Sequence, residues 1–472
     1  MKNFKSISFY SAQSIVSGIL IIAIIPIISH HIIPKDFGEF VLAQIYTGFL
    51  VGIANLGLLL GYERNFFLYE KSKRKSAKLF SSVFSLVFIN ILILFFFIFY
   101  FEDTLISMFA LSSKNNNLLL LLFSSLSLFS LSQYYLTYMK NSGHAKRYFY
   151  FMVSNSFMHF SLTIIFLNYF EASIMSLVYS SLFSNLFLFF SLFLYHLKNL
   201  HVIFDSQILK EVLKISLPLS PRLLLGPLSS QIDKILLGMI GSSGLVGIYH
   251  MGQTIAVTTF QFMTSIERTF QPVIYRKLFS KQNSSNSSEI GNFLVPYMYL
   301  SIFFASIVTL FSKEFIELFM PNSYLDSRII VSILTVYYAM LFFGKVNGTQ
   351  IIFLKKTIFT SVIAFVGVGL NFTLNLILIP YWGIIGASIA TLFSGVLVMI
   401  ITFFIAQKSA RINFNWRFTM IFYLLFAIAT LHVITDYIYQ FNNMLSLSIK
   451  FFLVLAFVLL GLKMHIFNYM KK

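Results

Sequence analysis

Two charged side chains, Arg222 and Asp233, lie in a strongly apolar stretch and are the first candidates for chemistry. They are 11 residues apart, and at about 100° per residue a continuous helix would leave about 20° between them. The two groups, with Ser229 between them, would then share one helix face. Such an arginine can hold an anion, and the aspartate can neutralise it when no anion is bound. The alternative is a structural ion pair to another helix.

The same stretch contains residues that interrupt helices, namely Pro218, Pro221, Gly226 and Pro227. Proline removes a backbone donor and kinks or breaks a helix. Inside a membrane, a broken helix is tolerated where it is buried in protein or lines a water-filled cavity. The break therefore adds to the case for a site around Arg222.

Lys345 is a second candidate cation. It lies about ten residues, or roughly 15 Å, from the end of its apolar stretch, which is too far for easy snorkelling to the surface. The nearby polar residues Asn347, Thr349 and Gln350 suggest a wet surface. A charge held this deep is expected to face protein or water.

Two further lysines have competing interpretations. Lys234 points about 100° away from Asp233 on a helix, and it either contributes to the same anion site or snorkels to the interface. Lys450 lies one to two turns from the end of its apolar stretch, so we expect it to snorkel.

Glu63 and Arg64 close another apolar stretch. They either form an interfacial salt bridge, or Arg64 meets a phosphate at the mouth of a cavity, where its planar fork suits phosphate oxygens. Glu267 and Arg268 repeat the Glu-Arg order in the second half of the chain. Glu63 and Asp233 are thus the candidate charge partners, and the candidate cations are Arg222, Lys345, Arg64 and Lys234.

Other site chemistries find little support in the sequence. Cysteine is absent, which excludes disulfides and thiolate catalysis. The nine histidines form no metal-binding pattern, and no phosphate-binding loop is present, so we expect neither a metal, nor a cofactor, nor ATP hydrolysis by this chain.

Composition identifies the elements that position these residues. The chain has 472 residues, of which 58% are hydrophobic and 11% charged, with a mean hydropathy of +0.82. Apolar stretches of the length that spans a bilayer recur from end to end. We place about 14 membrane-spanning helices, at 8–29, 39–61, 79–101, 116–138, 148–168, 173–195, 214–240, 246–272, 292–312, 327–354, 357–379, 384–407, 417–436 and 443–463.

The net charge of +18 is explained by topology. With these spans, 26 of the 34 basic residues fall on the side of both termini and only four on the other, namely Lys35, Lys114, Lys313 and Arg328. This asymmetry is typical of the positive-inside rule, so both termini are predicted to be cytoplasmic. The first span lacks a cleavage pattern and is predicted to be retained.

A faint internal repeat links the two halves. Gly38–Gln44 and Gly247–Gln253 both have the order Gly-x-aromatic-x-x-small-Gln, at an offset of 209 residues. Two more pairs recur at similar offsets, the starts of the sixth and twelfth spans and Lys140 with Lys355. We therefore predict two parallel six-helix lobes, at 1–200 and 201–410, around a central cavity, with two additional helices at 411–472.

Three segments carry a family resemblance. Residues 371–391 resemble the asparagine-rich helix, Ile-Pro-x-x-Gly-Ile turn and following helix of polysaccharide-export and O-antigen flippases, which share a superfamily with multidrug extruders and lipid II flippases. Residues 232–249 and 34–40 are similar to two other helix junctions of that family.

The resemblance implies a two-lobed flippase with a cationic cavity, in the bacterial inner membrane. The implied substrate is an undecaprenyl-diphosphate-linked oligosaccharide for O-antigen, capsule or other exopolysaccharide, and a glycan polymerase and chain-length proteins are the implied partners. Nucleic acid is not expected as a partner, because topology accounts for the basic excess.

Two alternatives to a lipid-oligosaccharide flippase have less support in the sequence. A multidrug antiporter of the same superfamily would favour acidic residues for organic cations, whereas the charges within these spans are mostly basic. A membrane glycan polymerase would need a long loop for its chemistry, and the loops here are short. We therefore expect a transporter and not an enzyme.

The topology is testable with reporter fusions. Fusions after Leu111, Asn322 and Asn442 should report the periplasm, and fusions after Lys75 and Lys472 the cytoplasm, because the basic loops stay inside. A reporter that reads the opposite side at any of these positions would contradict both the span assignment and the repeat.

Overall fold

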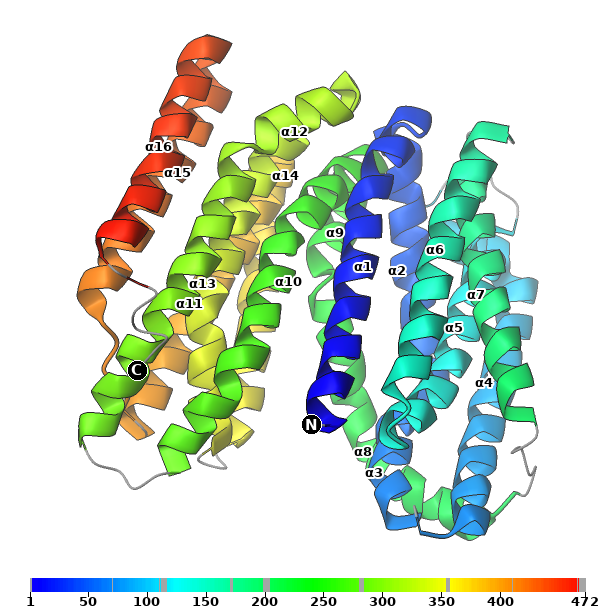
Figure 1. The fold of residues 1–472 in the computed structure, drawn as a ribbon. Coiled ribbons are helices and arrows are strands. Elements are labelled where there is room, and N and C mark those ends of the chain that lie inside the picture. Colours follow the sequence, from blue (N-terminus) through cyan, green and yellow to red (C-terminus); the bar gives the residue numbers. More distant parts are fainter. Residues whose placement is uncertain are drawn as a thin grey trace. The chain divides into compact units, whose positions relative to one another are not determined.

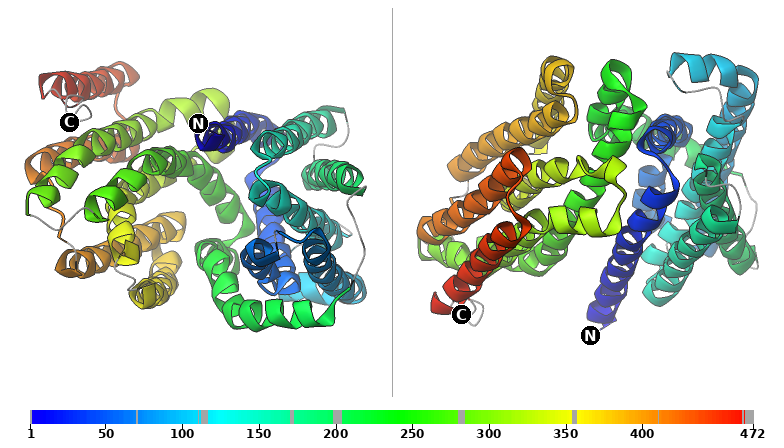
Figure 2. Two further views of the ribbon diagram at one scale, coloured as in Figure 1. Left: turned by 60° about the horizontal axis from the view of Figure 1, so that its bottom comes forward. Right: turned by 90° about the horizontal axis from the view of Figure 1, so that it is seen from above.

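The computed structural model describes residues 2–69, 71–109, 111, 117–169, 173–197, 204–279, 284–353, 357–409, 411–464 and 466. These residues form helices joined by short turns, with no strand in the part described. They separate into two compact units, Met1–Gly247 and Ile248–Lys472. Each unit is a bundle of long helices (Figures 1 and 2).

The first unit holds nine helices and the beginning of a tenth. They are α1 (Lys2–His31), α2 (Pro34–Asn55), α3 (Leu58–Tyr69), α4 (Lys73–Met108), α5 (Leu118–Asn141), α6 (Ala145–Tyr169), α7 (Ile174–His196), α8 (Ser206–Ser229) and α9 (Ile232–Leu236), then the π-helical turn η2 (Leu237–Gly241) and the first residues of α10 (Ser243–Phe279).

The second unit holds the rest of α10 and the following helices. They are α11 (Ser284–Leu310), α12 (Ser312–Phe319), the 3-10 turn η3 (Asn322–Tyr324), α13 (Ser327–Phe353), α14 (Thr357–Ser409), α15 (Trp416–Tyr439) and α16 (Asn443–Lys463).

Eleven helices of the described chain are long and apolar enough to cross a membrane. One of them, α14, contains two of the expected spans, and α8–α9 and α10 correspond to the seventh and eighth. The described residues of every expected span are thus helical apart from short breaks, and the prediction of an all-α membrane protein is confirmed. The parallel relation between two six-helix lobes stays a prediction.

The second expected span is broken between α2 and α3. Leu56 and Gly57 have positive φ values of 49° and 70°, so the chain turns there. Asn55 bridges the break because its Oδ1 accepts from the backbone N–H of Leu59 at 3.2 Å and from the Tyr134 hydroxyl at 3.0 Å. These bonds replace helical ones that the turn removes, as the absence of water in a bilayer demands.

The glycines of the repeated motif have a packing role. A Cβ on Gly38 would lie 1.7 Å from the carbonyl oxygen of Ser243, and one on Gly247 would lie 2.1 Å from that of Pro34. The beginnings of α2 and α10 thus touch backbone to backbone, which only glycine permits. The first glycine of each motif copy is thus accounted for by this one crossing.

The second unit has a large aromatic core. Phe270, Phe342, Phe422 and Phe457 are buried and belong to α10, α13, α15 and α16. The Tyr299 hydroxyl on α11 donates to the carbonyl of Phe457 at 3.0 Å. The last two helices therefore pack into this unit, side by side in Figure 1.

Candidate functional site

The helix that carries Arg222 is not broken at its prolines: α8 runs on through Pro218, Pro221 and Pro227, and the interruption comes only after Ser229. α8 ends at Ser229 and α9 begins at Ile232, after which one π-helical turn follows. π-turns often occur at functional sites. The side chains of Arg222 and Ser229 lie outside the described residues. Because the helix is not continuous, the shared face of Arg222 and Asp233 does not follow from periodicity alone and stays a prediction.

Asp233 and Lys234 are both buried directly after this interruption, with exposed fractions of 4% and 1%. The Asp233 Oδ1 accepts the backbone N–H of Lys234 at 2.8 Å, and the Lys234 ammonium donates to Gln231 Oε1 at 2.5 Å. Lys234 does not snorkel in this structure. The broken segment thus encloses a cation and an acid.

Lys345 on α13 forms an ion pair with Glu267 on α10, with 3.0 Å between Nζ and Oε2. Its ammonium also lies 5.2 Å from the ring centre of Phe260. The lysine side chain is 32% exposed and the glutamate 12%. The ammonium is therefore paired but still accessible, while the side chain of Arg268 lies outside the described residues.

The polar residues that follow Lys345 are not on a wet surface. Asn347, Thr349 and Gln350 are all buried, with exposed fractions of 2% or less. Neither polar atom of the Asn347 amide has a hydrogen-bond partner among the described residues. Their presence in the sequence indicated water, but the structure places them between helices.

Glu63 and Arg64 do not pair with each other. Glu63 binds the ammonium of Lys140 on α5 at 2.7 Å. Arg64 is exposed, and no ion pair to it is found among the described residues. Of the candidate cations, Arg64 and Lys234 lie in the first unit and Lys345 lies in the second.

A neutral polar cluster lies within α14. Gly383, at φ 51° and ψ −124°, breaks this helix in a backbone conformation that glycine adopts readily and other residues rarely do. The two halves of the helix fold against each other. The Asn371 amide donates to Thr391 and Ser394 at 3.3 and 3.2 Å, and Asn375 donates to Asn371 at 3.1 Å. The motif in residues 371–391 thus packs as a hydrogen-bonded hairpin.

The prediction that Lys450 snorkels is wrong. Its side chain is fully buried, and its ammonium binds Glu314 Oε1 at 2.6 Å. Lys450 is on α16 and Glu314 is on α12, 136 residues away in the sequence. The carboxylate of Glu314 neutralises the lysine and so allows the ammonium to be buried. An apolar stretch read alone could not reveal that partner.

A second buried ion pair joins this one. Lys313 on α12 binds Asp436 Oδ2 on α15 at 3.1 Å. Ser446 also donates to that carboxylate, at 3.2 Å, and its hydroxyl lies 3.4 Å from His432 Nε2. These polar groups fasten the last two helices to α12.

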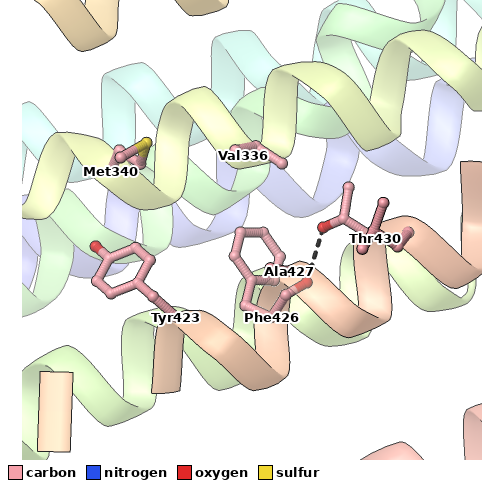
Figure 3. A pocket seen from close by; sticks show the side chains of 7 residues that line it. Val336, Met340, Tyr423, Phe426, Ala427 and Thr430 are labelled. Atoms are coloured by element: carbon pink, nitrogen blue, oxygen red, sulfur yellow. Dashed lines mark hydrogen bonds between the residues drawn. The ribbon is translucent and has the colours of Figure 1, made fainter. Parts of the chain in front are cut away.

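An apolar cavity of about 400 Å³ lies between α13 and α15 (Figure 3). Its lining side chains are Val336, Met340, Tyr423, Phe426, Ala427, Thr430 and Leu431. The two hydroxyl groups are turned to the backbone, since Tyr423 donates to Ala339 O at 3.1 Å and Thr430 to Phe426 O at 2.9 Å. The cavity therefore suits a hydrocarbon chain.

Comparisons with known proteins agree with this architecture. A family model described as polysaccharide biosynthesis protein matches residues 27–328. No curated protein matches the chain by sequence.

Among solved structures, the chain resembles the inward-closed lipid II flippase MurJ with a TM-score of 0.72 and 16% identity, over 98% of this chain and 99% of that one. An outward-facing multidrug resistance MATE family transporter of the MOP superfamily gives 0.55 and 16%, over 86% and 95%. A Vibrio cholerae MATE transporter gives 0.57 and 16%, over 86% and 97%. The chain is thus a multi-pass membrane protein with the fold that these flippases and transporters share.

The buried pair of Lys450 and Glu314 predicts a large stability effect. Glu314→Gln should destabilise the protein by about 3 kcal/mol because it leaves a fully buried ammonium without a counter-charge. Adding Lys450→Met should recover most of the loss. Thermal unfolding in detergent measures both.

Glu317→Gln is the matched control, because Glu317 lies on the same helix but is 39% exposed and bonded to Arg328 at 3.5 Å. It should cost about 1 kcal/mol or less. If Glu317→Gln and Glu314→Gln lower the melting temperature equally, the buried pair has no special role.

Proposed function

Because the chain belongs to the polysaccharide biosynthesis protein family, we propose that it moves an undecaprenyl-diphosphate-linked oligosaccharide from the cytoplasmic to the outer leaflet. The cycle is alternating access between two six-helix lobes. The repeat unit belongs to an O-antigen, a capsule or another exopolysaccharide. The protein lies in the bacterial inner membrane with both termini in the cytoplasm, and hands its cargo to a glycan polymerase and chain-length proteins.

The observation that carries the proposal is the ion pair of Lys345 and Glu267. The Lys345 side chain, inside a span, is 32% exposed, and its ammonium lies 3.0 Å from the Glu267 carboxylate. A diphosphate can replace that carboxylate at the ammonium without leaving a buried cation unpaired in either state. The same exchange serves Arg222 with Asp233, and the exposed Arg64 meets the diphosphate at the cytoplasmic mouth.

The apolar cavity between α13 and α15 supports a lipid-linked cargo. A polyprenyl chain is wholly hydrocarbon, and the cavity wall offers it no free hydroxyl because Tyr423 and Thr430 bond to the backbone. Hydrophobic contact with such a wall favours the chain by about 25 cal/mol for each Å² buried. A soluble organic cation gains less from such a surface.

Charge also separates the proposal from its main alternative. A multidrug antiporter for organic cations needs an accessible carboxylate. In the described part of the spans, Asp233 is 4% exposed, Glu63 is bonded to Lys140 and Glu267 is bonded to Lys345. Among the described candidate residues, the accessible charges are Arg64, Lys345 and Glu63, so that cations, which suit an anion, outnumber the single carboxylate.

Export of the glycan in a complementation assay tests the site. Arg222→Ala and Lys345→Ala should each lower export about tenfold or more while the protein still accumulates in the membrane, since each removes a charge-assisted bond to phosphate. Arg222→Lys should recover part of the activity, because it keeps the charge but loses the planar fork.

A double variant separates binding from mere neutralisation. If Lys345 serves only to neutralise Glu267, then Lys345→Met with Glu267→Gln should restore export. We expect the double variant to stay defective, because no cation is left for the diphosphate. Full export by Arg222→Ala and Lys345→Ala together would show that the diphosphate binds elsewhere.

A further inference from the structure

The corner between α3 and α4 carries a dense group of cations. Lys71, Lys73, Arg74 and Lys75 fall within five consecutive residues, and all four are exposed. With Lys78 the stretch 70–78 contains five cations and one acid, Glu70, so its formal charge is +4. Glu70 itself lies outside the described residues.

Nearby acidic groups are already occupied. Asp205 binds Lys78 at 2.8 Å, which lowers the pKa of the aspartate. Glu211 on α8 accepts from the Tyr69 hydroxyl at 2.6 Å, and this bond raises the pKa of Tyr69 to about 12. These contacts fix the corner to α8.

The four cations themselves contribute little to the fold. In the described chain none of them forms an ion pair, and Lys75 lies 6.0 Å from the ring centre of Tyr69. Three of them, Lys73 to Lys75, occupy the first turn of α4, where the helix dipole disfavours positive charge. Fold stability alone would favour acidic residues at these positions.

The cluster lies at the height of lipid headgroups. α4 has 36 residues and is therefore about 54 Å long, well beyond the roughly 30 Å of a hydrocarbon core. The apolar part of the helix begins at Leu79. At the end of α3, Phe67 and Leu68 are 58% and 66% exposed. Exposed apolar side chains beside a polybasic stretch are the arrangement that binds an anionic membrane surface.

The positive-inside rule explains the sign of this loop but not its density. In the second unit, Arg276, Lys277 and Lys281 are spread over six residues, and Lys408, Arg411 and Arg417 over ten. We propose that residues 67–69 and 71–75 form a binding site for the phosphate headgroups of acidic phospholipids, which collect around this corner and hold it at the membrane surface. This site includes none of Arg64, Arg222 and Lys345, the cations proposed to bind the diphosphate cargo.

The absence of cysteine permits a local measurement. A single Ser76→Cys is labelled with a fluorophore, and the protein is reconstituted in vesicles of equal phosphatidylcholine and phosphatidylglycerol. A nitroxide headgroup quencher is carried by either one lipid or the other. Asn413→Cys, beside the dispersed cations of the second unit, is the matched control position.

Quenching at residue 76 should favour phosphatidylglycerol about fivefold at low salt and lose that preference at about 0.5 M salt. The joint variant of Lys71, Lys73, Arg74 and Lys75 to Gln should abolish the preference. Gln at Lys408, Arg411 and Arg417 should leave it unchanged.

Because all substituted cations are exposed, elution as a monodisperse peak serves as the check on folding. Equal quenching by both lipids at residue 76 would overturn the proposal. So would an equal preference at residue 413, or a preference that survives neutralisation of the four cations. Loss of glycan export would not bear on it, because the readout is lipid proximity.

Discussion

An ion inside a membrane needs a counter-charge or water, and this requirement organises the structure. Three cations of the second unit are bonded to carboxylates on other helices: Lys345 to Glu267, Lys450 to Glu314, and Lys313 to Asp436. The pairs differ in accessibility. Lys450 is fully buried and holds helices together, whereas Lys345 is one third exposed and can exchange its partner. Exposure thus separates a structural pair from a candidate site.

Much of the helical architecture could be predicted from the sequence, because the hydrophobic length of a span is a local property. The Pro-Gly turn after Ile379 also predicted two spans, and α14 does consist of two helices that fold against each other at Gly383. The break at Leu56 was not foreseen. A leucine with positive φ carries no sequence signal, and only Asn55 and Tyr134, from helices far apart in sequence, make the break tolerable.

The site was less accessible to sequence reasoning, because a partner's identity depends on packing. Arg64 follows Glu63 directly, yet Glu63 pairs with Lys140, 77 residues away. Lys450 could not be recognised as buried without Glu314. The polar residues after Lys345 indicated water, but all three are buried between helices. The sequence singled out Lys345 because a deep lysine is costly wherever it points, but it did not foresee the pairing with Glu267, and the role of Lys345 stays a prediction. The roles of Arg222 and Asp233 stay predictions.

The proposed function requires that Arg222, Lys345 and Arg64 bind the diphosphate of a lipid carrier. The most direct measurement uses the purified protein in proteoliposomes that contain a fluorescent undecaprenyl-diphosphate oligosaccharide, with a membrane-impermeant glycosidase added outside. We expect the protein to expose the inner-leaflet glycan to the enzyme, and the same glycan on a neutral polyprenyl carrier to stay protected. Equal exposure of the glycan on both lipids would contradict diphosphate binding by these cations. Uptake of an organic cation without any movement of the glycan lipid would contradict the proposed flippase function.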